Sequence, residues 1–141
     1  MDQTTVEALR SSPFFAGLAD EDLERIAEMG EPVSFGEGET IIEKGTSGDA
    51  MFVLLWGTTE LEAGGRVHKP GAGQAVGEMA LFSKKKRTAT VTAGGPVEAL
   101  RIPAERFHDF LLQNPSVAVG ILEQVVERLR EVQDRVEAWY G

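Results

Sequence analysis

Between residues 31 and 102 the chain alternates short runs of strand-forming residues with glycine-rich turns. The runs read PVSF, TIIE, AMFVLLW, TELEA, TATVT and VEALRI, and the turns between them read GEG, KGTSGD, GG, PGAG and GGP. Glycine supplies the positive φ angles that tight turns require, whereas β-branched and aromatic residues favour strands. Strands at such close and regular spacing predict an antiparallel sandwich or barrel, because parallel βαβ units would need helices between them.

Helical patterns stand on both sides of this region. The segment DEDLERIAEMG predicts a helix with Asp20 as its N-cap and Gly30 as its stop, and VEALRSSPFF predicts a shorter one that ends at Pro13. After Pro103, AERFHDFLLQN predicts a helix closed by Pro115. We therefore expect one α+β, mainly β, domain over residues 1–141. Its parts are a helical lead-in (1–30), a strand region (31–102) and C-terminal helices (103–141).

The last segment predicts one long helix, SVAVGILEQVVERLREVQDRVEAWY, which would span roughly 37 Å. Apolar residues recur in it at alternating spacings of four and three. These residues, here called the seam, are Ala118, Leu122, Val125, Leu129, Val132, Val136 and Trp139. Because a small barrel cannot cover so long a seam, the pattern predicts a homodimer through this helix. Packing of the helix against its own barrel is the alternative.

Charge and composition limit the possible functions. The formal net charge is -9, so the surface repels nucleic acid and anionic membranes, and we expect this chain alone to bind neither. Without cysteine, and with His68 and His108 far apart in sequence, the chain predicts no metal site, no thiol chemistry and no enzyme. The N-terminus is not a signal peptide, and AMFVLLW is too short to span a membrane, which favours a cytoplasmic location.

The positive charge of this acidic chain is concentrated in GEMALFSKKKRTATV, residues 77–91, where Lys84, Lys85, Lys86 and Arg87 are consecutive. Gly77 precedes a stretch that could form one or two helical turns, and free backbone N–H groups at such a start bind anions. The planar fork of an arginine suits a phosphate, and a carboxylate accepts hydrogen bonds from sugar hydroxyls. Together these groups predict a site for a phosphorylated sugar.

The stretch VGEMALFSKKKRTATVTA resembles the phosphate-binding cassette of the cyclic nucleotide-binding domain family, and residues 76–91 are here called the cassette. The resemblance extends over roughly residues 8–130, through FGEGETIIEKGTSGDAMFVLLWGTTEL and the lead-in SPFFAGLADEDLERIA. It implies an antiparallel β-roll, or jelly roll, of about eight strands with a short cassette helix and a long C-terminal helix. It also implies a regulatory module whose ligand is cyclic AMP or, second, cyclic GMP.

The resemblance assigns the nucleotide to Gly77, Glu78, Met79, Ala80, Arg87, Thr88 and Ala89. In it, the backbone amides after Gly77 bind the cyclic phosphate, Arg87 pairs with that phosphate, and Glu78 accepts from the ribose 2′-hydroxyl. Thr88 offers its hydroxyl to the phosphate or to a guanine edge. The purine is capped from the long helix, for which the apolar candidates are Leu122, Val125, Val126 and Leu129, with Trp139 and Tyr140 as secondary candidates. Ligand binding would then shift this helix.

Two features depart from the family pattern. Lys86 stands where close relatives often have proline, and the cassette loop carries lysines where many members have small residues. These lysines could draw the ligand inward, or they could meet an acidic protein partner. The alternative function is a degenerate β-roll that binds no nucleotide and acts through contacts with an effector protein.

Overall fold

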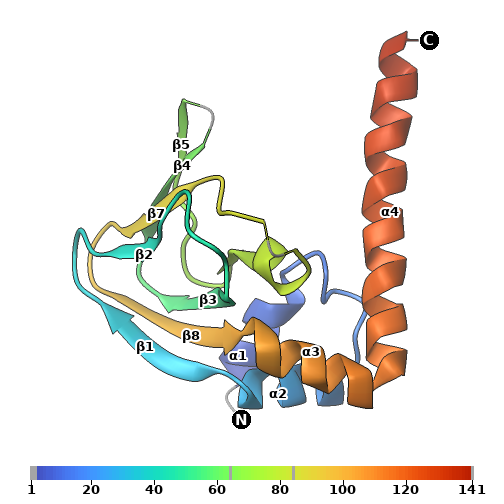
Figure 1. Ribbon diagram of the computed structural model, residues 1–141, viewed down its shortest axis with the longest axis horizontal. Helices are drawn as coiled ribbons and strands as arrows, with labels where there is room; N and C mark the ends of the chain where they lie inside the picture. The colour runs from blue at the N-terminus through green and yellow to red at the C-terminus, as the bar shows by residue number, and fades with distance from the viewer. Residues whose placement is uncertain (1–2, 64, 84, 141) are drawn as a thin grey trace.

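The computed structural model describes residues 3–63, 65–83 and 85–140. Within these ranges the chain folds into two N-terminal helices, eight strands, one 3-10 turn and two C-terminal helices (Figure 1). The helices are α1 (Gln3–Arg10), α2 (Asp20–Glu28), η1 (Glu78–Leu81), α3 (Ala104–Gln113) and α4 (Pro115–Tyr140). The strands are β1 (Glu31–Phe35), β2 (Thr40–Ile42), β3 (Ala50–Trp56), β4 (Thr59–Ala63), β5 (Arg66–His68), β6 (Ala75–Val76), β7 (Thr90–Ala93) and β8 (Val97–Pro103). The predicted α+β, mainly β, class is confirmed.

The strands of the described ranges form two four-stranded sheets, ordered β1-β8-β3-β6 and β2-β7-β4-β5, and neighbouring strands pair antiparallel. The six runs expected from sequence correspond to β1, β2, β3, β4, β7 and β8. Sequence analysis did not single out β5 and β6. β5 is exposed along its length and β6 has only two residues, so neither leaves an apolar run that could be read from sequence.

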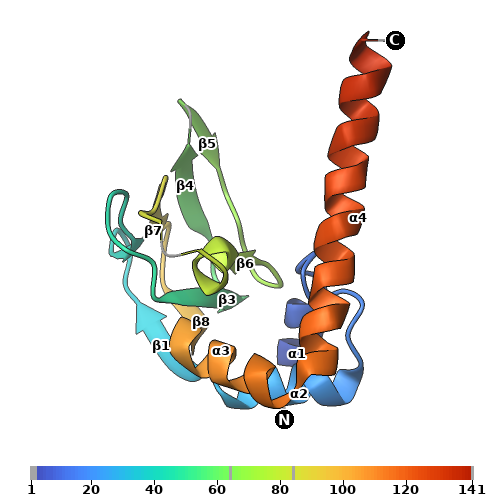
Figure 2. The same cartoon turned by 45° about the vertical axis from the view of Figure 1, so that its right-hand side comes forward.

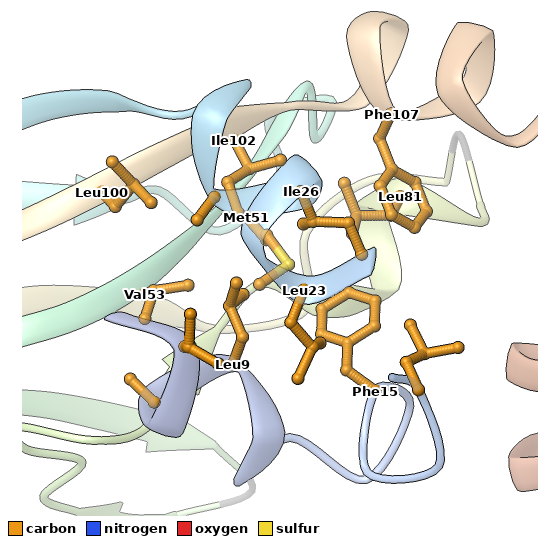
Figure 3. Close-up of a cluster of buried hydrophobic side chains, with 14 of the residues drawn as sticks. Leu9, Phe15, Leu23, Ile26, Met51, Val53, Leu81, Leu100, Ile102 and Phe107 are labelled. Atoms are coloured by element: carbon orange, nitrogen blue, oxygen red, sulfur yellow. The ribbon is translucent and has the colours of Figure 1, made fainter. Parts of the chain in front are cut away.

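Strand β3 separates two hydrophobic clusters, which explains its continuous apolar sequence. Met51 and Val53 face the helices together with Leu23, Ile26 and Phe107 (Figure 3). The alternate residues Phe52 and Leu54 face the space between the two sheets. A strand buried on both faces needs apolar residues at every position. Trp56, the last residue of β3, is 60% exposed, because the pairing of β3 with β8 shifts register between Leu54 and Trp56 at the strand's end.

The expected Asp20 cap is wrong. Ala19 occupies the N-cap position of α2 and makes no side-chain hydrogen bond there, while Asp20 is the first residue inside the helix. The Asp20 carboxylate pairs with Arg10, the last residue of α1. Since a carboxylate in the first turn is stabilised by the helix dipole, Asp20 still favours this start without capping it.

The buried side chains that the structure describes in helix α4 lie near its beginning. Val117 and Ile121 are buried in the helical cluster, and a Cβ atom built on Gly120 would lie 3.0 Å from Leu18 Cδ2. From residue 125 to residue 136 each described side chain is exposed. Figures 1 and 2 both show this part of α4 standing apart from the sheets. Among the helices described, none is both long and apolar enough to cross a membrane.

Candidate functional site

The cassette begins with a turn that only glycine accommodates. Gly77 follows β6 and has a φ of +78°, a conformation that residues with a Cβ rarely adopt. A Cβ at this position would lie 2.7 Å from Arg87 Nη1 and 2.9 Å from Ile42 Cδ1. The backbone therefore passes directly beside the arginine that the sequence assigned to phosphate binding.

After this turn the chain enters η1, the short helical turn that the sequence predicted. Leu81 closes η1 and is fully buried, and its side chain lies beside Phe107 of α3 in the helical cluster (Figure 3). The Leu81 carbonyl is also hydrogen-bonded by His108 Nε2. The far end of η1 is thus fixed to α3 through both apolar and polar contacts.

Arg87 is held by hydrogen bonds of both its side chain and its backbone. Its Nη1 donates to Gly77 O at 3.1 Å and its Nη2 to Ala50 O at 2.5 Å. Its backbone N–H donates to Thr46 O at 2.7 Å, and its carbonyl accepts from Gly45 N at 2.9 Å. A guanidinium has five N–H donors, so the two side-chain bonds orient the group and leave donors for an anion.

Burial lowers the pKa of the Arg87 guanidinium, and the nearby Asp49 carboxylate offsets part of that effect. An arginine remains charged at neutral pH after such a change, because its ordinary pKa lies far above neutral. Asp49 is itself paired with Arg101, whose Nη2 lies 3.1 Å from Asp49 Oδ2. The cassette arginine is therefore a positioned, partly desolvated cation, which is what recognition of a phosphate requires.

Glu78, the first residue of η1, is half-buried as expected. Burial raises the pKa of its carboxyl group, and the charge of Arg128 on α4 and a hydrogen bond from its own backbone N–H lower it in part. A partly desolvated carboxylate is a strong acceptor for a hydroxyl donor. The long C-terminal helix thus acts electrostatically on a residue of the cassette.

These groups open into one pocket of about 360 Å³ between the cassette and the β2-β7-β4-β5 sheet. The lining residues are Ile42, Leu61, Gly77, Glu78, Ser83, Lys85, Lys86, Arg87, Thr88, Ala89 and Val91. Charged groups come from the cassette, and an apolar wall comes from the strands. A pocket at the lower end of the usual 300–1,000 Å³ range, apolar with a few polar groups, suits one small organic ligand.

Five of the residues assigned from sequence therefore line the same pocket, namely Gly77, Glu78, Arg87, Thr88 and Ala89. Met79 and Ala80 continue the backbone of η1, but their side chains lie outside the described residues, as do Lys84 and the side chains of Trp139 and Tyr140. The four suggested purine-capping residues of α4 do not line the pocket. Leu122, Val125, Val126 and Leu129 are 59%, 37%, 41% and 65% exposed.

The apolar wall of the pocket was not predicted from the sequence. Val91 of β7 pairs with Ile42 of β2 on one side and with Leu61 of β4 on the other, so the three side chains form a row across the sheet. The alternation in TATVT places Ala89 and Val91 on one face and could have indicated part of this wall. Which residues of β2 and β4 stand beside Val91 depends on strand register, which the sequence does not display.

No group of three or more His, Cys, Asp or Glu side chains that could hold a metal ion occurs among the residues that the structure describes. The two histidines that the sequence analysis considered lie apart in the fold. His68 is in the exposed β5, and His108 contacts the end of η1 from α3.

Comparison with known proteins identifies relatives that match most of the chain. The family model described as "Cyclic nucleotide-binding domain" matches residues 32–114. A cyclic nucleotide-gated potassium channel from Rhizobium etli is 33% identical over 116 residues, which are 82% of this chain and 33% of the channel. The isozyme 1 of the cGMP-dependent protein kinase from Drosophila melanogaster is 32% identical over 114 residues, 74% of this chain and 15% of the kinase. The chain thus spans a third or less of these relatives.

A solved structure agrees with the fold. The N-terminal domain of a transcriptional regulator from Streptomyces coelicolor superposes with a TM-score of 0.81 at 31% identity, covering 92% of this chain and 94% of that domain. The match includes the helices on either side of the roll, since it extends well beyond residues 32–114. By sequence, by fold and by the cassette that lines its pocket, the chain belongs to the cyclic nucleotide-binding domain family.

Proposed function

We propose that the chain is a regulatory module that binds a 3′,5′-cyclic nucleotide in the pocket beside the cassette. The observation that carries this proposal is the convergence of Gly77, Glu78 and Arg87 on one cavity with an apolar wall. Arg87 pairs with the cyclic phosphate, together with the backbone amides of Met79 and Ala80. Glu78 accepts from the ribose 2′-hydroxyl, and Thr88 and Ala89 line the pocket beside Arg87.

The proposed ligand is cyclic AMP, with cyclic GMP as the second candidate. A Thr88 hydroxyl suits the phosphate in either case, and it could also bond a guanine edge. One relative carries cyclic GMP in its name, whereas the channel's name specifies no base. Both nucleotides therefore belong in the first binding experiment.

Ligand binding is proposed to act on α4. A ligand shifts a conformational equilibrium only by its difference in affinity for the two arrangements. Two connections from the pocket support such a difference: η1 is fixed to α3 at Leu81, and Arg128 of α4 acts electrostatically on Glu78. The suggested cap of Leu122, Val125, Val126 and Leu129 would require α4 to approach or rotate toward the pocket, because these side chains lie outside its lining here.

The seam on α4 is proposed to form a homodimer. Its described members from Leu122 to Val136 are each at least 37% exposed, and no other element of the described chain covers them. Heptad-spaced apolar residues on a helix of 26 residues are the usual basis of a two-stranded coiled coil. An effector protein contacted through the same helix would receive the ligand's signal.

The decisive experiment is calorimetric titration of the chain with cyclic AMP and with cyclic GMP, beside Arg87→Ala. We expect at least one nucleotide to bind with micromolar or tighter affinity and to raise the melting temperature. Arg87→Ala should lose about 2–4 kcal/mol of binding free energy, because a desolvated charged hydrogen bond is removed. The exposed Arg66→Gln, which also removes one positive charge, should bind as the unmodified chain does.

Arg87 also bonds two protein carbonyls, so the ligand-free melting temperature of Arg87→Ala must be measured beside its affinity. If that variant does not fold, Glu78→Gln tests the same pocket without touching these bonds. Absence of both heat and thermal stabilisation with either nucleotide would favour the alternative, a degenerate β-roll that acts through protein contacts.

A further inference from the structure

The proposed function uses Arg87 but leaves the neighbouring lysines without a role. Lys85 and Lys86 both line the pocket, and both are exposed to solvent, whereas Arg87 is half-buried. We propose that Lys85 and Lys86 form a capture site, which accelerates the arrival of the anionic ligand at the pocket while Arg87 holds it afterwards. This inference rests on the proposed binding of a cyclic nucleotide.

The backbone of the loop is anchored while the two ammonium groups remain in water. Lys86 forms a β-bridge with Ser47, and the N–H of Lys85 donates to Ser83 Oγ at 3.3 Å. Among the ion pairs between residues that the structure describes, none includes either lysine. Their charges are therefore presented at a fixed edge of the pocket and are not neutralised by the protein.

The surface around this edge has the opposite sign. The chain has a net charge of -9, so an approaching anion is repelled by the molecule as a whole. Even the sheet that forms the pocket wall is acidic on its outer face, where Glu60 and Glu62 lie beside Thr90 and Thr92 in a small depression. Leu61, between those two glutamates, faces the pocket instead. Within the lining, Lys85, Lys86 and Arg87 outnumber the single carboxylate of Glu78.

Exposed lysines change the association rate of a ligand more than its dissociation rate. A solvated ammonium on a flexible stem gains little from a contact in water, but its field still raises the local concentration of anions. At a separation of about 8 Å in water, one unit charge changes the local concentration of an opposite unit charge roughly twofold. Removing both lysines should therefore slow association about fourfold at low salt.

The salt dependence of the association rate shows whether attraction or repulsion governs the encounter, and this test needs no variant. If the overall charge of -9 governed the encounter, added salt would screen the repulsion and association would become faster. A local capture site predicts the reverse, with association slowing as salt is added, because the attraction at the pocket is screened. The Debye length falls from about 20 Å at 20 mM salt to about 4 Å at 500 mM. Attraction over about 8 Å is therefore weakly screened at the lower salt concentration and strongly screened at the higher one.

The experiment is stopped-flow mixing of the full chain with cyclic AMP that carries a fluorescent group on its purine, at 20 and 500 mM salt. The variant is Lys85→Gln/Lys86→Gln. The matched control is Arg66→Gln/Lys69→Gln, which removes the same charge from exposed positions outside the lining. We expect about fourfold slower association for the lysine variant at 20 mM, little difference at 500 mM, an unchanged dissociation rate and no such loss in the control.

Three results would overturn the capture site while leaving nucleotide binding intact. Association of the unmodified chain could be independent of salt or accelerated by it. Dissociation of the lysine variant could be faster with unchanged association, which would make the lysines direct ligands of the bound phosphate. Both rates could be unchanged, which would leave the loop as a surface for an acidic protein. Failure of the unmodified chain to bind cyclic AMP or cyclic GMP at all would instead overturn the proposed function.

Discussion

At Gly77 the backbone turns from β6 into η1 with a φ of +78°, and the Arg87 guanidinium and Ile42 occupy the space that a side chain would need. Two separate effects thus require glycine at this position: the backbone angle and the crowding. The same guanidinium donates to the Gly77 carbonyl. The turn and Arg87 are therefore one structural unit, in which a change to either residue disturbs the other.

Gly77→Ala should destabilise the ligand-free fold by about 2–4 kcal/mol, since it combines the strain of a positive φ with overpacking. The matched control is Gly38→Ala, which has a φ of +82° and nothing within 4 Å of the added Cβ. The Gly38→Ala variant should lose only the contribution of backbone strain to the free energy of unfolding, about 1–2 kcal/mol. Urea unfolding of both variants measures the difference, and equal losses would show that Arg87 and Ile42 move aside without cost.

The sequence predicted the pocket lining best where the lining residues are close along the chain. Gly77, Glu78 and Arg87 belong to one continuous cassette, so their types and spacing are enough to suggest a phosphate site. Ile42 and Leu61 come from two other strands, and only the register of β2 and β4 against β7 brings them beside Val91. Asp20 was misplaced by one position because several residues near a helix start can serve as a cap, and the backbone decides among them.

At the scale of elements, α4 carries two different faces. Val117, Ile121 and Gln124 follow one another at helical spacing toward the core, and Arg128 continues the same row one turn later. The seam lies about 100° around the helix from this row, since its members from Ala118 to Leu129 each follow a member of the row by one residue. Arg128 therefore turns toward the cassette, in agreement with its effect on the pKa of Glu78, while the seam turns elsewhere.

Burial raises the pKa of Glu78 above its ordinary value of 4.5, so the folded chain binds a proton more readily than the unfolded chain. The contribution of Glu78 to the free energy of unfolding is therefore most favourable below pH 4.5. This contribution is lost as the pH rises through the pKa that Glu78 has in the folded chain. Arg128 opposes this shift. Arg128→Gln should raise the pKa of Glu78 further and extend the loss of stability to higher pH.

Arg130→Gln is the matched control for this prediction, because it removes the same charge from α4 about 200° around the helix from Arg128. Carboxyl NMR titration of Glu78 in the ligand-free chain gives the pKa directly. We expect an upward shift in Arg128→Gln and a smaller one in Arg130→Gln. Equal shifts in the two variants would mean that Glu78 senses only the total charge of the helix and not its orientation.

At the scale of the molecule, the helical period of the last segment predicted α4 and its exposed seam, since both follow from spacing alone. The orientation of α4 relative to the β-roll could not be predicted in this way. It depends on a few contacts between distant segments, such as Gly120 with Leu18 and Gln124 with Gly17, where close approach is possible because glycine is small. The continuous core of β3 and the antiparallel sheets were easier to predict, because they follow from local patterns of apolar residues and turns.

If the seam forms a homodimer, a charge within it should separate the two copies. Leu129→Glu places a carboxylate at a position that is 65% exposed in the single chain. The free energy of unfolding of the monomer should therefore change by no more than about 0.5 kcal/mol. Sedimentation equilibrium should show at least a tenfold weaker dimer. Arg130→Gln changes the charge by the same amount outside the seam and should leave the association unchanged. A chain that is monomeric before any substitution would contradict the dimer.

Helix α4 is held at its base and free along most of its length, so it has the geometry of a lever. Its 26 residues span about 39 Å, and a tilt of about 10° at the base would carry the far end through about 7 Å. The base lies next to α3, and His108 of α3 is hydrogen-bonded to the Leu81 carbonyl at the end of η1. A displacement of the cassette by a fraction of a bond length would thus be magnified at the tip, where a partner could detect it with no contact to the pocket.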